Sequence, residues 1–237
     1  MWYLSDANRL LGLHEEGIQQ VKEASKIHQQ LNDAFGQAHC LGLLGWLLYD
    51  DQQFDTVEEA ASQSINLLPE KSDQSLVCNY YRLLGEICSS KGDTEKAISH
   101  FEAALRTASA FGWYYEQFLN HHSLAVLFLD QGRFDDSRAH IECSKLHAVN
   151  NLYLAARTMR LQADFWYRQD RLREARSEAL RAADALEKVG ATRNLETCRG
   201  LLRDIEEAME KSTTPAQGTK QYRLRLFQFL QIFHRSP

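Results

Sequence analysis

Residues 78–105, CNYYRLLGEICSSKGDTEKAISHFEAAL, contain the pattern that decides the fold. In the first half, Cys78, Tyr81, Leu84 and Cys88 recur at steps of three and four residues. This spacing is typical of an amphipathic helix, which buries one apolar stripe against a neighbour. The first half therefore predicts a helix with a single buried face.

A turn and a second helix follow. Gly92 lies between Lys91 and Asp93, and glycine readily adopts the left-handed backbone conformation that ends helices. Asp93 or Thr94 can then cap the next helix by accepting hydrogen bonds from its first amide groups. The apolar face of this second helix consists of Ala97, Phe101, Ala104 and Leu105. The whole stretch therefore predicts a helical hairpin.

The same arrangement returns along the chain at a nearly constant interval. The predicted turns are centred on Gly12, Gln52, Gly92, Gly132 and Asp170. Successive turns are 40, 40, 40 and 38 residues apart. A repeat of this length indicates stacked units that are each too small to bury their own apolar face. Neighbouring hairpins must therefore cover one another.

Small residues also recur at equivalent places. In the first helices they are Gly45, Gly85, Ala125 and Ala163, and in the second helices they are Ala24, Ser64, Ala104, Ser144 and Ala182. Helices whose axes lie about 8–10 Å apart need small side chains where they cross. A constraint on size thus repeats together with the constraint on hydrophobicity.

This pattern resembles the tetratricopeptide repeat, and its clearest copy is carried by Tyr81, Leu84-Gly85, Gly92, Ala97, Phe101 and Ala104. Pro69 stands where that motif has its closing proline. The familiar repeat has about 34 residues, so we expect longer helices or junctions here. The resemblance implies an all-α fold, a right-handed superhelical solenoid of antiparallel helix hairpins. We expect residues 1–211 to form about five repeats, the first truncated at Met1, with a capping helix over residues 193–211.

Residues 46–209 are also similar to the tetratricopeptide arrays that follow NB-ARC or NACHT nucleotide-binding modules in fungal signalling ATPases. The similarity is carried by residues 67–71 (LLPEK), 165–167 (FWY) and 178–184 (EALRAAD). The sequence has no glycine-rich phosphate-binding loop followed by Lys and Ser or Thr. The resemblance therefore implies a fragment of a longer array, the sensor or regulatory part of a larger signalling ATPase.

Composition and charge exclude several classes of protein. Residues 220–237 carry four basic residues and no acidic one, so residues 1–219 have a formal charge of −9, against −5 for the whole chain. An acidic body argues against nucleic-acid binding. No apolar stretch approaches the roughly 20 residues of a membrane span. Five cysteines without short paired spacing, and no N-terminal secretion signal, indicate a cytoplasmic protein with reduced thiols.

The C-terminal part lacks the repeat pattern. Residues 212–219 predict a turn-forming linker. Residues 220–237 are basic and apolar, and we expect them to be poorly ordered. The alternative is a peptide that binds a partner or a membrane surface.

The stripe of each first helix that packing leaves over is predicted to line a concave groove. Its members are His39, Trp46, Tyr49, Asp50, Asn79, Arg82, Glu86, His122, Asp130, Arg157, Arg160, Asp164, Tyr167 and Arg168. Aromatic and arginine side chains dominate binding hot spots, so we expect Trp46, Tyr49 and Tyr167 to anchor a protein or peptide partner. The alternative is a solvated helix face, with Arg160 and Asp164 paired four residues apart.

Three functions are compatible with this sequence. The first is a non-catalytic interaction scaffold, in which the cluster Arg157, Arg160, Arg168 and Arg171 favours an acidic partner segment. The second is a structural spacer or self-association module, for which Trp2, Leu4, Leu10 and Leu11 offer an unpaired apolar edge. The third is an enzyme on a helical scaffold.

The sequence gives little support to catalysis or metal binding. His140, Cys143 and His147 share one helix face, but a fourth ligand is lacking. No nucleophile or carboxylate pair lies in a recognisable motif. We therefore expect no enzymatic activity and no cofactor, and we favour the scaffold.

Overall fold

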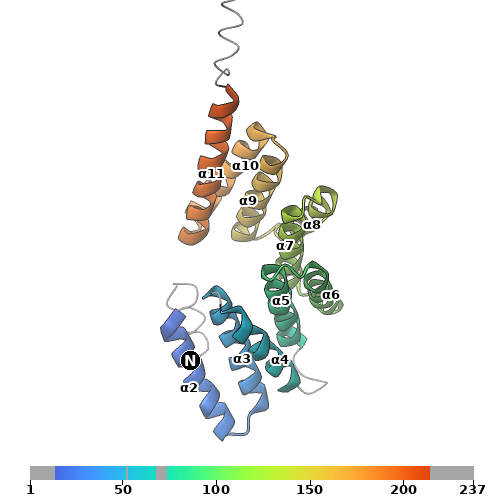
Figure 1. Cartoon of the computed structure of the whole chain (residues 1–237), viewed down its shortest axis with the longest axis vertical. Helices are drawn as coiled ribbons and strands as arrows, with labels where there is room; N and C mark the ends of the chain where they lie inside the picture. The colour runs from blue at the N-terminus through green and yellow to red at the C-terminus, as the bar shows by residue number, and fades with distance from the viewer. Residues whose placement is uncertain (1–13, 52, 68–73, 214–237) are drawn as a thin grey trace, which may run out of the picture. The chain divides into compact units, whose positions relative to one another are not determined.

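The computed structural model describes residues 14–51, 53–67 and 74–213, and this part of the chain contains ten α-helices and no strand (Figure 1). The helices are α2 (His14–Gln30), α3 (Ala34–Asp50), α4 (Phe54–Leu67), α5 (Gln74–Ser90), α6 (Thr94–Ala110), α7 (Tyr114–Asp130), α8 (Phe134–His147), α9 (Leu152–Arg168), α10 (Leu172–Lys188) and α11 (Thr192–Thr213). The predicted all-α fold of helix hairpins is confirmed. The predictions for Gly12, Gln52, Pro69, residues 1–11 and the tail from residue 214 lie outside the described residues.

Uniform helix length explains the 40-residue repeat. Helices α2, α3, α5, α6, α7, α9 and α10 each have 17 residues. Turns of three residues separate most of them, as at residues 91–93 and 111–113. Two helices and two such turns make one period. The longer repeat therefore comes from longer helices, and its junctions are short.

A single type of turn joins most of these helices. In the α5–α6 turn, the Asp93 amide donates to the Cys88 carbonyl (2.8 Å) and the Gly92 amide donates to the Ser89 carbonyl (3.0 Å). The same two bonds close the turns at residues 31–33, 111–113, 131–133, 169–171 and 189–191. The middle residue has a positive φ in every case, 79° at Gly92 and 59° at Asp170, as this helix-ending motif requires. The sequence pattern predicted such turns within hairpins only, but the structure also places them between hairpins.

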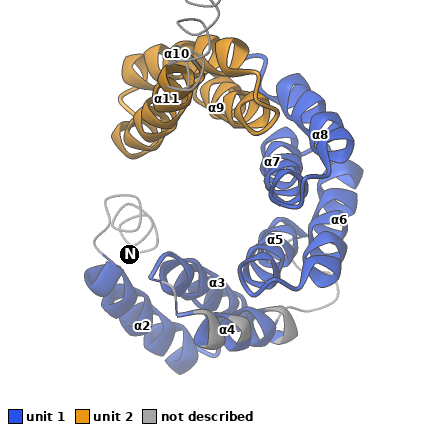
Figure 2. Ribbon diagram, turned by 45° about the horizontal axis from the view of Figure 1, so that its top comes forward, with its two compact units in different colours: residues 1–150 blue, residues 151–237 orange. Residues whose placement is uncertain are grey.

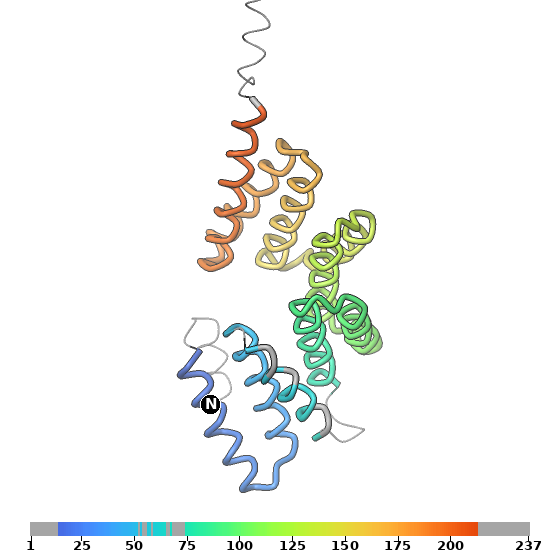
Figure 3. Tube along the Cα trace, in the orientation of Figure 1, coloured from blue at the N-terminus to red at the C-terminus, as the bar shows by residue number. Residues whose placement is uncertain are grey.

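The chain divides into two compact units, residues 1–150 and 151–237. In unit 1, α3, α5 and α7 lie side by side on one face, and α4, α6 and α8 lie on the opposite face (Figure 2). We call the face made by α3, α5 and α7 the inner face of unit 1. In unit 2, α10 packs against both α9 and α11, and α9 also contacts α11 (Figure 3).

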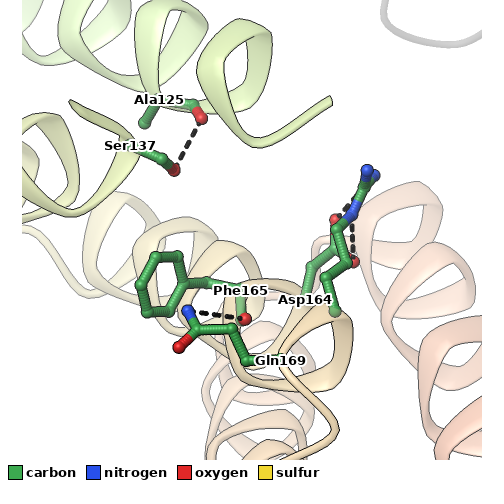
Figure 4. Close-up of polar contacts among 6 residues, drawn as sticks. Ala125, Ser137, Asp164, Phe165 and Gln169 are labelled. Carbon is green, nitrogen blue, oxygen red and sulfur yellow. Dashed lines mark hydrogen bonds and ion pairs between the residues drawn. The ribbon is translucent and has the colours of Figure 1, made fainter. Parts of the chain in front are cut away.

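Small residues let the helices approach closely, as the sequence predicts. All of them are buried: Ala24, Gly45, Ser64, Gly85, Ala104, Ala125, Ser144, Ala163 and Ala182. A Cβ atom added at Gly85 would lie 2.6 Å from a carbon of the Phe101 ring. One buried serine also forms a hydrogen bond between two helices, since Ser137 Oγ of α8 donates to the Ala125 carbonyl of α7 at 2.8 Å (Figure 4).

Candidate functional site

The residues predicted to line the groove all lie on first helices of the hairpins. Helix α3 carries His39, Trp46, Tyr49 and Asp50, α5 carries Asn79, Arg82 and Glu86, and α7 carries His122 and Asp130. The remaining five, Arg157, Arg160, Asp164, Tyr167 and Arg168, lie on α9 in unit 2. The first set therefore lies on the three helices that form the inner face of unit 1, and the second set lies in unit 2.

Three predicted residues form a connected group on that face. The Trp46 indole N–H donates to Asn79 Oδ1 at 2.8 Å, and Arg82 Nη2 donates to the same oxygen at 3.3 Å. The Arg82 guanidinium carbon lies 4.1 Å from the centre of the Trp46 ring, within range of a favourable cation–π interaction. The arginine head is therefore held in one orientation by α3 and by its own helix.

Tyr49 and Glu86 extend this group. The Tyr49 ring meets the Trp46 ring edge-on at 5.9 Å, and its hydroxyl lies 3.3 Å from Ser90 Oγ. Burial, followed by the negative charge of Glu86, raises the pKa of the Tyr49 phenol. The Glu86 carboxylate in turn accepts a hydrogen bond from the Ser123 hydroxyl of α7. Polar contacts thus connect α3, α5 and α7.

Two polar residues of α7 escaped the sequence analysis. Burial raises the pKa of the Glu116 carboxyl, an effect that the charge of Arg82 partly offsets. Asn120 is fully buried and donates to the Glu116 carbonyl at 2.8 Å, while its Oδ1 has no hydrogen-bond partner among the described residues. The sequence gives no signal for these residues, because their burial depends on how α7 packs against its neighbours.

Exposure differs among the predicted residues of unit 1. Trp46 is 9% exposed and His122 is 5% exposed, so both offer less contact area than an apolar anchor would need. His39, Tyr49, Asp50, Asn79 and Glu86 are half-buried, whereas Asp130 is exposed at the end of α7. The accessible part of this face is therefore mainly polar. Their role in binding a partner stays a prediction.

In unit 2, the ion pair on α9 differs from the expected one. Arg168 holds Asp164, which is labelled in Figure 4, through Nε (3.1 Å) and Nη2 (3.4 Å). Asp164 thus pairs with the residue four positions after it, and the expected Arg160–Asp164 pair is not formed. Arg171 is committed to Glu174 at 2.7 Å and lies over the Trp166 ring at 3.9 Å. It therefore does not join the predicted arginine cluster.

Arg160 has a different environment from the other arginines of α9. It is half-buried, and its Nε has no hydrogen-bond partner among the described residues. Burial, and next the positive charge of Arg157, lowers the pKa of the Arg160 guanidinium, an effect that the charge of Asp164 partly offsets. Tyr153 lies on the same helix, and its hydroxyl accepts a hydrogen bond from Asn194 of α11 at 3.0 Å.

Histidines cluster between α7 and α8 in unit 1. The Nδ1 atoms of His121 and His140 are 2.9 Å apart, and the His147 ring stacks on the His121 ring at 5.8 Å. Burial, reinforced by the two neighbouring histidines, lowers the pKa of His121 to about 4. No group of three His, Cys, Asp or Glu residues in the described part of the chain is placed to hold a metal ion.

The buried thiols are poor nucleophiles. Burial, reinforced by the charge of Glu116, raises the pKa of the Cys78 thiol to about 12, and burial also raises the pKa of Cys198. Since the thiolate is the reactive form, neither cysteine is activated for covalent chemistry. None of the described helices combines the length and apolar composition that crossing a bilayer requires.

Comparison with known proteins agrees with this architecture. Residues 81–112 match the family model of the tetratricopeptide repeat. One such repeat is therefore present. It spans the end of α5, its turn, α6 and the next turn. No curated protein matches the chain.

Two solved structures are similar in fold. BtubC (BKLC) from P. vanneervenii matches 83% of this chain and 92% of its own, with a TM-score of 0.60 and 15% identity. A Rap protein complexed with Competence and Sporulation Factor matches 87% of this chain with a TM-score of 0.64 and 11% identity. The match spans 63% of the Rap chain. At these identities the likeness concerns the fold alone.

Proposed function

We propose that this chain is a non-catalytic scaffold that binds a polypeptide segment on the first helices of its hairpins. The fold is typical of protein–protein interaction scaffolds, and one solved structure of similar fold is a complex with Competence and Sporulation Factor. The observation that carries the proposal is the ordered group formed by Trp46, Asn79 and Arg82. An arginine fixed before binding loses little side-chain entropy when a partner arrives.

The bound segment would cross α3, α5 and α7 on the inner face of unit 1. This face offers hydrogen-bond donors on Arg82 and hydrogen-bond acceptors on Glu86 and Asn79. Such a mixture suits the backbone and polar side chains of a peptide better than an apolar ligand.

The test is a selection of peptides from a random 12-residue display library on the full chain. Affinities of selected peptides are then measured by calorimetry for Arg82→Ala and for Arg106→Ala, a matched control. Arg106 is exposed on α6 and lies 3.9 Å from Glu102. We expect Arg82→Ala to weaken binding at least about tenfold, as hot-spot truncations do. Equal loss in both variants, or a failure to select peptides, would refute the proposal.

A second candidate is association through exposed aromatic residues. At the α6–α7 turn, Phe111 is 56% exposed, Tyr114 is 69% exposed and Tyr115 is 53% exposed. Exposed apolar surface of this kind marks contact sites, and it favours a spacer that packs side by side with another molecule. Light scattering at increasing concentration tests this function, and an association that survives Tyr114→Glu with Tyr115→Glu would exclude this patch.

The finer hypothesis, that the chain is the regulatory part of a fungal signalling ATPase, rests on sequence resemblance. In such a protein the inner face of unit 1 would sense a ligand or hold a nucleotide-binding module inactive. The hypothesis requires a phosphate-binding loop in a longer product of the same gene. A full-length transcript that encodes no such loop would remove it.

A further inference from the structure

One guanidinium in unit 2 has no ion pair of its own, because the carboxylate in its electrostatic range, Asp164, is paired with Arg168. Arg160 is half-buried, its Nε has no hydrogen-bond partner, and no ion pair to it occurs among the described residues. The carboxylate one helical turn further along, Asp164, is already held by Arg168 through two bonds. A partly desolvated charge whose nearest carboxylate is bonded to another arginine is incompletely compensated, which is unfavourable. An incoming anion would remove that cost.

The neighbours of Arg160 add to this preference. Arg157 lies one turn before it on α9 and repels its charge. Tyr153 lies another turn before, with the Arg157 guanidinium carbon 5.9 Å from its ring centre. Cys198 of α11 is within electrostatic range of Arg160, so the guanidinium is next to α11. Two cations thus share the face where α9 meets α11.

Two further polar groups beside the arginines, on Tyr153 and Asn194, are neutral. Asn194 of α11 donates to the Tyr153 hydroxyl at 3.0 Å. A hydroxyl that accepts one hydrogen bond keeps its own proton for a second partner. Tyr153 is therefore a donor for a ligand atom on this face. We call the group of Tyr153, Arg157, Arg160 and Asn194 the Arg160 site.

We propose that the Arg160 site binds a carboxylate of an acidic polypeptide segment, with Arg160 as the principal contact. The proposal rests on the proposed function, since it names the chemistry of a bound segment. The two terminal Nη groups of a guanidinium form a planar fork that matches the two oxygens of a carboxylate. A phosphate has further oxygens that need donors, and the site provides mainly one fork and one hydroxyl.

The experiment uses the full chain and fluorescein-labelled peptides of ten residues, in which Glu alternates with Gly. The comparison peptides replace Glu by Gln or by phosphoserine. We expect the Glu peptide to bind and the Gln peptide to bind at least tenfold more weakly, by fluorescence anisotropy. Arg160→Gln should abolish this preference, and Arg160→Lys should retain only part of it because lysine lacks the planar fork.

Arg181→Gln is the matched control for overall charge. Arg181 lies on α10, is exposed and pairs with Glu178 at 2.7 Å. We expect this variant to bind the Glu peptide as the wild-type chain does. An equal loss in Arg160→Gln and Arg181→Gln would refute the site, because only net charge would then matter. Preference for the phosphoserine peptide at Arg160 would overturn the carboxylate assignment.

Failure of this proposal is distinguishable from failure of the proposed function. If library peptides depend on Arg82 but the Glu peptide ignores Arg160, the scaffold stands and the Arg160 site falls. A thermal melt of Arg160→Gln accompanies the binding data. Should that variant unfold, the partial retention expected for Arg160→Lys still decides the question.

Discussion

Arg82 and Arg160 occupy the same position, the ninth residue of a 17-residue first helix, in unit 1 and unit 2 respectively. Arg82 lies on the Trp46 ring and bonds to Asn79, whereas the residue equivalent to Asn79 in α9 is Arg157. One arginine is therefore part of the packing, and the other repels its neighbour. The comparison teaches that the position within a repeat sets where a side chain lies on its helix. The residues around that position determine which contacts the side chain makes.

The largest change in the free energy of unfolding is expected at the contact between Phe101 and Gly85, which has no counterpart of the same size in unit 2. In unit 1, the ring of Phe101, which is 1% exposed, covers Gly85, while the equivalent residues in unit 2 are Ala179 and Ala163, both buried. Phe101→Ala should lower the free energy of unfolding by about 3–5 kcal/mol, because it leaves a cavity. Urea denaturation followed by circular dichroism measures this loss.

The control for this variant is Phe111→Ala. Phe111 is 56% exposed, so its removal should change the free energy of unfolding by less than about 1 kcal/mol. A loss as large as that of Phe101→Ala would contradict the assignment of Phe101 to the core of unit 1.

Acid should destabilise the α7–α8 hairpin of unit 1. The pKa of His121 falls from 6.5 to about 4 on folding. As the pH is lowered, His121 is therefore protonated in the unfolded chain before it is protonated in the folded chain. The stabilisation is complete above pH 6.5 and is lost as pH falls toward 4. Because His121 is partly exposed, we expect a loss on the order of 1 kcal/mol, well below the full value for such a shift.

Unit 2 supplies the control for the acid effect, since Met159 occupies the position equivalent to His121. His121→Met should flatten the dependence of the melting temperature on pH between 6.5 and 4. An unchanged slope would show that other groups cause the acid effect, and the histidine cluster would lose its role.

The same substitution at Arg82 and Arg160 tests the opening comparison directly. Arg82→Met removes a cation–π contact and a hydrogen bond, and should lower the free energy of unfolding by about 1 kcal/mol. Arg160→Met removes a half-buried charge that has no ion pair of its own, and should leave stability unchanged or raise it by up to about 1 kcal/mol. Thermal melts of both variants give the sign. A similar loss of stability in both variants would show that Arg82 and Arg160 contribute equally to folding, and would contradict the contrast drawn between them.

The smallest effect concerns the starts of the second helices. Asp93 caps α6 by accepting from the Lys96 amide at 3.3 Å, whereas Arg171 at the start of α10 makes no side-chain cap. Asp93→Ala should lower the melting temperature by at most about 3 °C. Arg171→Ala should change it less. A reversed order would show that the Arg171–Glu174 pair stabilises α10 more than a cap stabilises α6.

Much of the fold follows from patterns within one repeat. The spacing of Cys78, Tyr81 and Leu84 predicts a helix face, and Gly92 predicts its end. The sequence predicts a helix over residues 193–211, and α11 spans Thr192–Thr213. These features depend on helix geometry and on burial, and both impose a regular spacing of apolar residues that can be seen in the sequence.

The candidate site was less predictable because its contacts join different repeats. Trp46 and Asn79 are 33 residues apart, and their bond depends on how α3 rotates against α5. Asp164 had arginines one turn before and one turn after it, so spacing alone left the choice of partner open. The partners of Glu116 and Asn120 likewise depend on the packing of α7, to which hydrophobic periodicity is insensitive.

The common length of the first helices limits how a bound polypeptide can lie on them. A helix of 17 residues is about 25 Å long at 1.5 Å per residue. An extended segment running parallel to one helix can therefore contact it over only about seven residues. A segment running across the helices meets a new one at each repeat, so longer ligands gain recognition only in that direction.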